Sequence, residues 1–188
     1  MTFTTKTNMG KFAVIAILVT SLLVGGGIWY AQTRGYYAPA DGPVTLTLAS
    51  PDGALTTLPA QNVEAIISNA SPLGFRACFQ HLLDVSTLGT DIPVALRADP
   101  GPTIAPDWFD CYDAGYVGEL LTSGEAVAYT AYPNVAYGVD RVVALTGDGR
   151  GWAWNELNDC GRKAYDGTPV GEACPDRETY EPLIEGSL

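Results

Sequence analysis

A run of twenty residues without a charge, residues 12–31, constrains this chain of 188 residues more than any other feature. An α-helix of that length rises about 30 Å, the thickness of the hydrocarbon core of a bilayer. Trp29 and Tyr30 lie at the end of the run, and aromatic rings are enriched at membrane interfaces. The run therefore predicts a transmembrane helix that is retained as an anchor.

The alternative is a cleaved signal peptide, whose apolar segment usually spans only about 7–15 residues. The best cleavage signal, residues 38–40, also lies far beyond the run. Lys6 and Lys11 precede the run, and the first forty residues contain no acid. By the positive-inside rule we expect residues 1–11 in the cytoplasm and the C-terminal part in the periplasm, with a single span through the inner (plasma) membrane.

The part of the chain beyond the run is strongly acidic. All 21 acids lie from Asp41 onward, against eight basic residues after the run, which gives this part a net charge of −13. A nucleic-acid binder is excluded, because it needs a basic face to neutralise phosphates. Charged residues make up only 16% of the chain, too few for a disordered protein. We expect a tether at 32–42, one folded domain at 43–174 and a C-terminal tail at 175–188.

Small residues recur along the apolar run. Ser21 and Gly25 have the small-xxx-small spacing at which two membrane helices approach closely. The candidate residues for a helix–helix contact are Ala13, Ala16, Thr20, Ser21 and Gly25. The alternative interpretation is that Ala and Gly are simply common in membrane helices.

Four cysteines, Cys78, Cys111, Cys160 and Cys174, all lie beyond the run. Four thiols allow three pairings, and disulfides persist in an oxidising compartment such as the periplasm. We predict the pairs Cys78–Cys111 and Cys160–Cys174, because the second closes a short loop rich in Gly, Pro and Asp that has little else to hold it. A zinc site and thioredoxin-like chemistry are disfavoured, since the chain has one histidine and no C-x-x-C motif.

The pattern beyond the run predicts an α+β domain, a small antiparallel sheet with one or two packed helices. The segments with strand character are 43–50, 54–58, 73–79, 125–132, 139–146 and 151–154. The sequence Gly147-Asp148-Gly149 is a strong hairpin signal between the last two strands. Apolar spacing at 63–67 predicts a short helix, and a second helix is expected from the cap Asp107 to Gly124.

Candidate catalytic or metal-binding side chains are few. His81 is the sole imidazole, and no partner is identifiable by spacing, so we interpret it as a surface or strand-end residue rather than a general base. Asp107, Asp110 and Asp113 repeat every three residues. They could supply oxygens to Ca²⁺, but acids in a first helical turn also cap the free N–H groups, and capping is the simpler interpretation.

Aromatic residues gather on two expected strands. Trp152 and Trp154 alternate on one strand and so point to one face, while Tyr129 and Tyr137 lie on or near the neighbouring strand. If that face is exposed, it is a docking surface for a partner protein or a sugar, since Trp and Tyr are enriched in binding hot spots. If it faces the helices, it is the core, which is the simpler interpretation for a small domain.

The chain also resembles a known family. The segments that carry the resemblance are 75–79 (FRACF), 105–114 (APDWFDCYDA), 123–126 (SGEA), 137–144 (YGVDRVVA) and 147–150 (GDGR). They are similar to a family of uncharacterised single-span alphaproteobacterial membrane proteins, some of which are labelled histidine kinases. The resemblance implies this architecture and this cysteine pairing, but no functional residue. The kinase label is not supported, because no ATP-binding segment follows His81.

These observations favour a membrane-anchored periplasmic interaction protein without catalysis, such as an accessory or assembly subunit of an inner-membrane complex. Its expected partner is a membrane protein that contacts the anchor and the periplasmic domain, and no cofactor or nucleic acid is expected. The alternative is a periplasmic module that binds or senses a small ligand through the aromatic strands. An unrecognised enzyme is the third hypothesis.

Overall fold

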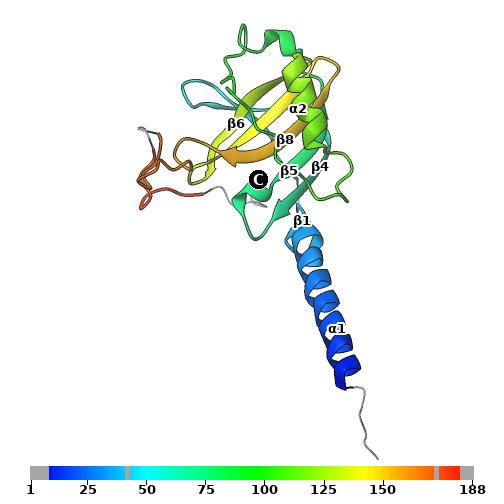
Figure 1. Ribbon diagram of the computed structural model, residues 1–188. Coiled ribbons are helices and arrows are strands. Elements are labelled where there is room, and N and C mark those ends of the chain that lie inside the picture. Colours follow the sequence, from blue (N-terminus) through cyan, green and yellow to red (C-terminus); the bar gives the residue numbers. More distant parts are fainter. Residues whose placement is uncertain (1–8, 41–42, 172–173, 183–188) are drawn as a thin grey trace, which may run out of the picture. The chain divides into compact units, whose positions relative to one another are not determined.

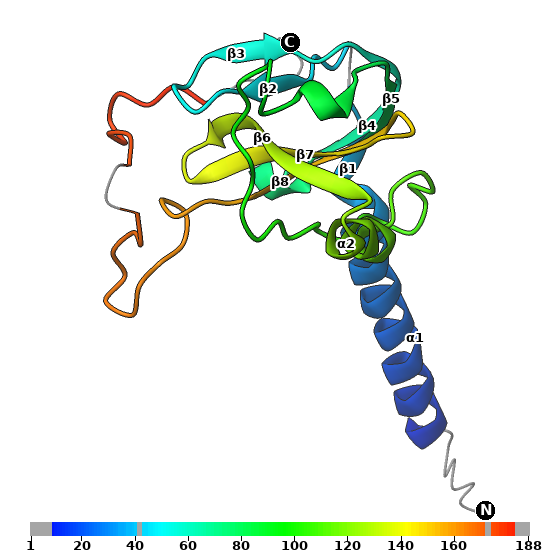
Figure 2. The same cartoon turned by 90° about the horizontal axis from the view of Figure 1, so that it is seen from above.

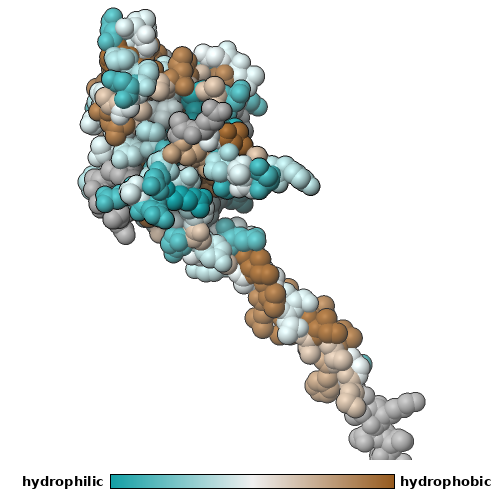
Figure 3. All heavy atoms as spheres, turned by 90° about the vertical axis from the view of Figure 1, so that its left-hand side faces the viewer, coloured by the Kyte–Doolittle hydropathy of each residue, from teal (hydrophilic) through white to brown (hydrophobic). Residues whose placement is uncertain are grey.

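The computed structural model describes residues 9–40, 43–171 and 174–182, and it divides the chain into two units at residues 36 and 37. The first unit is the helix α1 (Met9–Tyr30), extended by a π-helical turn (Ala31–Gly35). This helix is long and apolar enough to cross a membrane, as an anchor or as a signal sequence. Figure 3 shows hydrophobic colouring gathered along it. Lys6 lies outside the described residues.

The second unit is built on one six-stranded sheet, in which all neighbouring strands are antiparallel. In spatial order its strands are β1 (Tyr37–Pro39), β4 (Ala60–Ser68), β5 (Arg76–His81), β8 (Arg150–Leu157), β7 (Val139–Thr146) and β6 (Ala126–Ala136). The remaining elements are the hairpin β2 (Thr47–Ala49) and β3 (Leu55–Thr57), the helix α2 (Ala114–Ser123), and the 3-10 turns η2 (Pro72–Gly74) and η3 (Val85–Thr87). The predicted α+β class is confirmed (Figure 1).

The sheet has a core on each side, and Figure 2 shows α2 and the β2–β3 hairpin on opposite sides of it. On the helix face, α2 and the segment before it pack on Trp152 and Trp154. On the hairpin face, β2 and the loop after β5 pack on Phe75, Phe79 and Tyr129. The residues of the inner strand β7 are all buried, because each of them faces one of these two layers.

The prediction of a helix at 63–67 is wrong, because this segment is the middle of β4. Asn62 has a positive φ of 51°, and one extra residue at this point shifts the pairing of β4 with β5. Val63 and Ile67 then pack against the hairpin-face core, whereas Ile66 is buried on the helix face. Because both faces are covered, apolar residues follow one another in a pattern that imitates helical spacing.

The second predicted helix exists but begins six residues later than expected. Asp113, rather than Asp107, caps it, and its carboxylate accepts hydrogen bonds from the N–H groups of Gly115 (2.8 Å) and Tyr116 (3.1 Å). Gly124 ends the helix with a φ of 78°, as predicted. The residues between the two acids form turns instead of a helix.

The segment expected as a tether, 32–42, contains the end of the first helical unit and β1. β1 forms one edge of the sheet by pairing with β4, so the folded domain begins earlier than the expected residue 43. The predicted hairpins around residues 51–53 and 147–149 are both confirmed.

Candidate functional site

Both predicted disulfides are present. Cys78 of β5 lies 2.14 Å (S–S) from Cys111, which ties the segment before α2 to the helix face of the sheet. Cys160 and Cys174 lie 2.10 Å apart (S–S) and close the loop that follows β8. These two bonds pair all four cysteines of the chain.

The predicted aromatic face is core rather than surface. Trp152 and Trp154 are buried under α2, and Tyr129 is buried on the opposite face of the sheet. Tyr137 lies apart from them, half-buried in the β6–β7 turn, where its ring meets the ring of Tyr180 at a centroid distance of 5.9 Å. The core interpretation holds for the first three residues, and the four do not form one docking surface.

An open groove of about 940 Å³ lies at the end of the sheet where β6 turns into β7. We call it the Arg97 groove. The residues that line it are Leu96, Arg97, Ala98, Asp99, Thr130, Pro133, Asn134, Asp140, Asn158, Asp159, Cys160, Arg162, Val170 and Gly171. The disulfide-closed loop after β8 supplies one wall, because Cys160 and Gly171 both line it. The Cys160–Cys174 bond therefore helps to shape this hollow.

A compact ionic network underlies the groove. Arg97 Nη1 lies 2.8 Å from Asp140 Oδ2, and Arg97 Nε lies 2.5 Å from Glu156 Oε1. The second oxygen of Glu156 accepts hydrogen bonds from Gly101 N–H (2.9 Å) and Trp154 Nε1–H (2.9 Å). Because these side chains are largely buried, removing one partner would leave an uncompensated charge. The free energy of unfolding would then fall by about 3–5 kcal/mol.

Amide groups complete this network. Asp140 Oδ1 accepts hydrogen bonds from Asn134 N–H (2.8 Å) and Asn158 Nδ2–H (2.7 Å). Asn158 Oδ1 in turn accepts from the N–H groups of Cys160 (2.9 Å) and Gly161 (3.1 Å). The charged and amide groups that underlie the groove thus bind one another, which makes a rigid, preformed surface.

The exposed residues of the groove are both apolar and charged, since Asp99, Asp159 and Arg162 line it as well. Leu96 is 69% exposed and Val170 is 54% exposed, and both line the groove. A second hollow lies on the other side of residues 96–99, against Leu121 of α2 and Val127 of β6. Exposed apolar residues that are bordered by polar and charged groups are typical of a binding surface.

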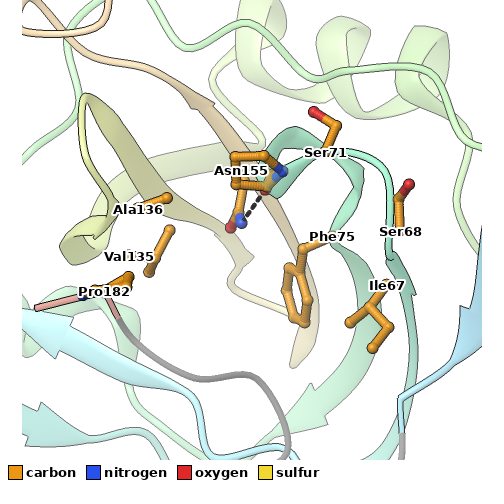
Figure 4. A pocket seen from close by; sticks show the side chains of 9 residues that line it. Ile67, Ser68, Ser71, Phe75, Val135, Ala136, Asn155 and Pro182 are labelled. Carbon is orange, nitrogen blue, oxygen red and sulfur yellow. Dashed lines mark hydrogen bonds between the residues drawn. The ribbon is translucent and has the colours of Figure 1, made fainter.

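A smaller apolar pocket of about 220 Å³ lies nearby (Figure 4). Its walls are Ile67, Ser68, Ser71, Pro72, Phe75, Val135, Ala136, Asn155 and Pro182. Asn155 Nδ2–H donates to the carbonyl oxygen of Pro72 (2.7 Å), and its Oδ1 accepts from Arg141 Nε–H (3.1 Å). The C-terminal segment reaches this region, since the Tyr180 hydroxyl donates to the carbonyl of Asn134.

His81 was expected at the surface or at a strand end. It lies at the end of β5, but it is buried, with only 3% of it exposed. Burial lowers its pKa, and neither ring nitrogen has a hydrogen-bond partner among the described residues.

Of the three acids proposed as caps, only Asp113 caps α2, while Asp107 and Asp110 are exposed in the preceding turns. Within the described part of the chain, no three His, Cys, Asp or Glu side chains are grouped to hold a metal ion.

Residues 44–175 match the model of a family of unknown function, DUF6446. The chain belongs to this family. The match covers the folded domain from before β2 to just beyond Cys174, so the apolar helix α1 lies outside it. The DUF6446 domain of this chain therefore includes both disulfides and the Arg97 groove. No curated protein and no solved structure matches the chain.

Proposed function

We propose that this DUF6446 protein is a non-catalytic interaction protein, anchored in the inner membrane by α1, that serves as an accessory or assembly subunit of a membrane complex. Its N-terminus would lie in the cytoplasm and its disulfide-containing domain in the periplasm. The Arg97 groove carries the proposal, because it combines a rigid floor with exposed apolar residues at its rim. Side chains that are held in place lose little entropy when a partner binds.

The chemistry of the groove supports binding more than catalysis. Arg97, Asp140 and Glu156 are engaged with one another and with main-chain groups, so their role is to hold a shape. The strongly acidic composition of the chain beyond α1 favours a partner segment that carries basic residues. Leu96 and Val170 would supply the apolar contacts to that segment.

The second candidate function is the binding of a small ligand, and the apolar pocket beside Phe75 favours it. Its volume of about 220 Å³ exceeds that of an engineered apolar cavity of about 150 Å³ that accepts benzene. A ligand of that size would place its apolar part against Ile67 and Val135.

Co-purification of the full-length tagged protein from membranes in mild detergent tests the first function. We expect a stoichiometric membrane partner whose recovery falls at least tenfold for Leu96→Ser combined with Val170→Ser, and falls with rising salt. Leu55→Ser is the matched control, because Leu55 is an exposed apolar residue on β3, outside the residues that line the groove. Equal recovery from both variants would contradict the assignment of the groove.

Absence of any partner would instead favour the ligand hypothesis. In that case Val135→Trp, which fills the apolar pocket, should abolish the thermal stabilisation that a binding small molecule confers. The Leu96 and Val170 changes should leave that stabilisation unaltered.

A further inference from the structure

We propose that His81 is an acid-sensitive latch, whose protonation releases the segment that covers the hairpin face of the sheet. This segment, residues 82–96, is called the cover. It runs from the end of β5 to Arg97, and Leu83, Val85, Leu88, Ile92 and Val94 pack it against the core. The latch is independent of what the Arg97 groove binds.

The position of His81 makes its protonation costly in the closed fold. Its N–H donates to the carbonyl of Gly149 in the β7–β8 turn (2.8 Å), and its ring centroid lies 6.5 Å from that of Phe79. The ring is almost completely buried, and neither nitrogen has a partner among the described residues. A buried imidazole without a close hydrogen-bond partner is accommodated as the neutral form, because charging it would add a large desolvation penalty.

The polar groups around the His81 ring favour its protonated form, but they offset the desolvation penalty only in part. Desolvation is the largest influence and lowers the pKa of His81, while the carbonyls of Arg150, Leu83 and Thr146 raise it more weakly. The carboxylate of Asp148 in the β7–β8 turn also raises the pKa of His81, but Asp148 is paired with Arg150 at 2.8 Å.

The other elements beside His81 bring little charge to it. In the cover, the carboxylate of Asp84 accepts hydrogen bonds from the N–H (3.0 Å) and hydroxyl (2.6 Å) of Ser86. On the neighbouring strand β4, the residue paired with His81 is Ala60. Protonation of His81 is therefore not stabilised by a dedicated counter-ion on either element.

The cover is the element that yields most easily. The main-chain hydrogen bonds around η3 are internal to the cover, such as Thr87 N–H to Asp84 O (3.1 Å) and Ile92 N–H to Thr87 O (3.0 Å). Its end is tied to the sheet, since Ala95 N–H donates to Ala49 O (2.7 Å) and Ala95 O accepts from Thr130 N–H (2.8 Å), so the part around η3 opens first. Neither disulfide includes a residue of the cover. Local opening costs least where backbone bonding is local and covalent ties are absent. Opening lets the imidazole reach water, where its pKa returns to about 6.5.

The direction of the effect follows from this difference. Because the pKa of His81 is lowered in the closed state, the open state takes up a proton first as the pH falls below about 6.5. Each further pH unit raises the opening equilibrium constant about tenfold, until the pKa of the closed state is reached. The closed cover is fully stable above pH 6.5 and is lost progressively in acid. Because the cover ends at Leu96 and is followed directly by Arg97, acid would also alter the Arg97 groove.

The test uses the full-length chain in detergent micelles, and it benefits from His81 being the sole histidine. With ¹³C-labelled histidine, one ring signal reports the titration without assignment. We expect that signal in the folded protein to show a pKa below 6.5. A ring that titrates at 6.5 or above in the folded protein would overturn the proposal, and this measurement requires no variant.

Hydrogen exchange at pH 7 and pH 5, corrected for intrinsic rates, then identifies the element that opens. We expect the opening of residues 82–96 to increase tenfold or more in the wild type, and by less than twofold in His81→Phe. Asp148→Asn is the matched control, because it removes the nearby carboxylate and retains the imidazole, so the acid response should persist. Equal acid responses in the wild type and His81→Phe would refute the latch.

Discussion

The two faces of the sheet are closed in different ways. The helix face is covered by α2 and the segment before it, and the Cys78–Cys111 bond ties that segment to the centre of the sheet. The hairpin face is covered by β2, β3 and the 82–96 cover, which neither disulfide includes. The helix face contains two buried tryptophans, whereas the hairpin face contains a buried imidazole without a partner.

Arg76 reinforces the helix face. Its buried guanidinium donates hydrogen bonds to four main-chain carbonyls, those of Leu73 (2.6 Å), Phe75 (2.5 Å), Thr103 (2.8 Å) and Ile104 (3.0 Å). These bonds hold the irregular segment at 103–104 against the sheet. The comparison indicates that one face is fixed by covalent and polar ties, while the other is held mainly by apolar packing and can respond to conditions.

The largest expected effect comes from removing the centre of the helix face. Trp154 is fully buried between β8 and the covering segment, so Trp154→Ala should lower the free energy of unfolding by about 3–5 kcal/mol. Urea denaturation monitored by circular dichroism measures this change. Tyr165→Ala is the control, because Tyr165 is fully exposed and its loss should have almost no effect. A loss below 1 kcal/mol for Trp154→Ala would show that this face is not the main core.

The next largest effect separates the two disulfides. Replacing Cys78 and Cys111 with Ser should cost about 2–4 kcal/mol of global stability, because that bond spans 33 residues and joins the segment before α2 to β5. The same double change at Cys160 and Cys174 should loosen mainly the wall of the Arg97 groove. Hydrogen exchange distinguishes the cases: exchange confined to residues 158–171 is expected for the second pair, and a uniform rise would contradict it.

The two disulfides were predictable because four cysteines can pair in few ways, and the final hairpin was predictable because its turn signal is local. Four cysteines allow only three pairings, and Gly147-Asp148-Gly149 forces a tight turn. The β4 strand was mistaken for a helix because a sheet covered on both faces does not show polar–apolar alternation, and the bulge at Asn62 shifts the pattern further. The burial of the opposite face depends on segments distant in the sequence, so it cannot be read from residues 60–68 alone.

The smallest effect concerns the start of α2. Asp113→Ala removes the side chain that accepts two main-chain N–H groups and should cost about 1 kcal/mol. Asp107→Ala is the matched control, because Asp107 is an exposed acid outside the helix, and its removal should change stability by less than about 0.5 kcal/mol. Thermal unfolding of the two variants side by side measures the difference, and a larger loss for Asp107→Ala would mean that the helix begins at the earlier acid.

The Arg97 groove was not predicted, and its sequence signal is weak. Arg97 lies in an irregular, proline-containing stretch, and its partners Asp140 and Glu156 are 43 and 59 residues away. In a chain with 21 acids, no spacing distinguishes these two from the others. His81 was expected at a strand end, but its burial depends on the β7–β8 turn, which lies far along the chain.

Hydrogen exchange of the oxidised full-length protein at pH 7 tests the difference between the two faces most directly. The account predicts that amides in β5, β8 and the segment at 109–121 are the most strongly protected, because they exchange only through openings with the largest free energies. It predicts that amides in residues 82–96 exchange through a separate opening that is easier by at least about 1.4 kcal/mol, a tenfold difference in rate. Equal protection of residues 82–96 and of the segment at 109–121 would contradict the account, because both faces would then open as one unit.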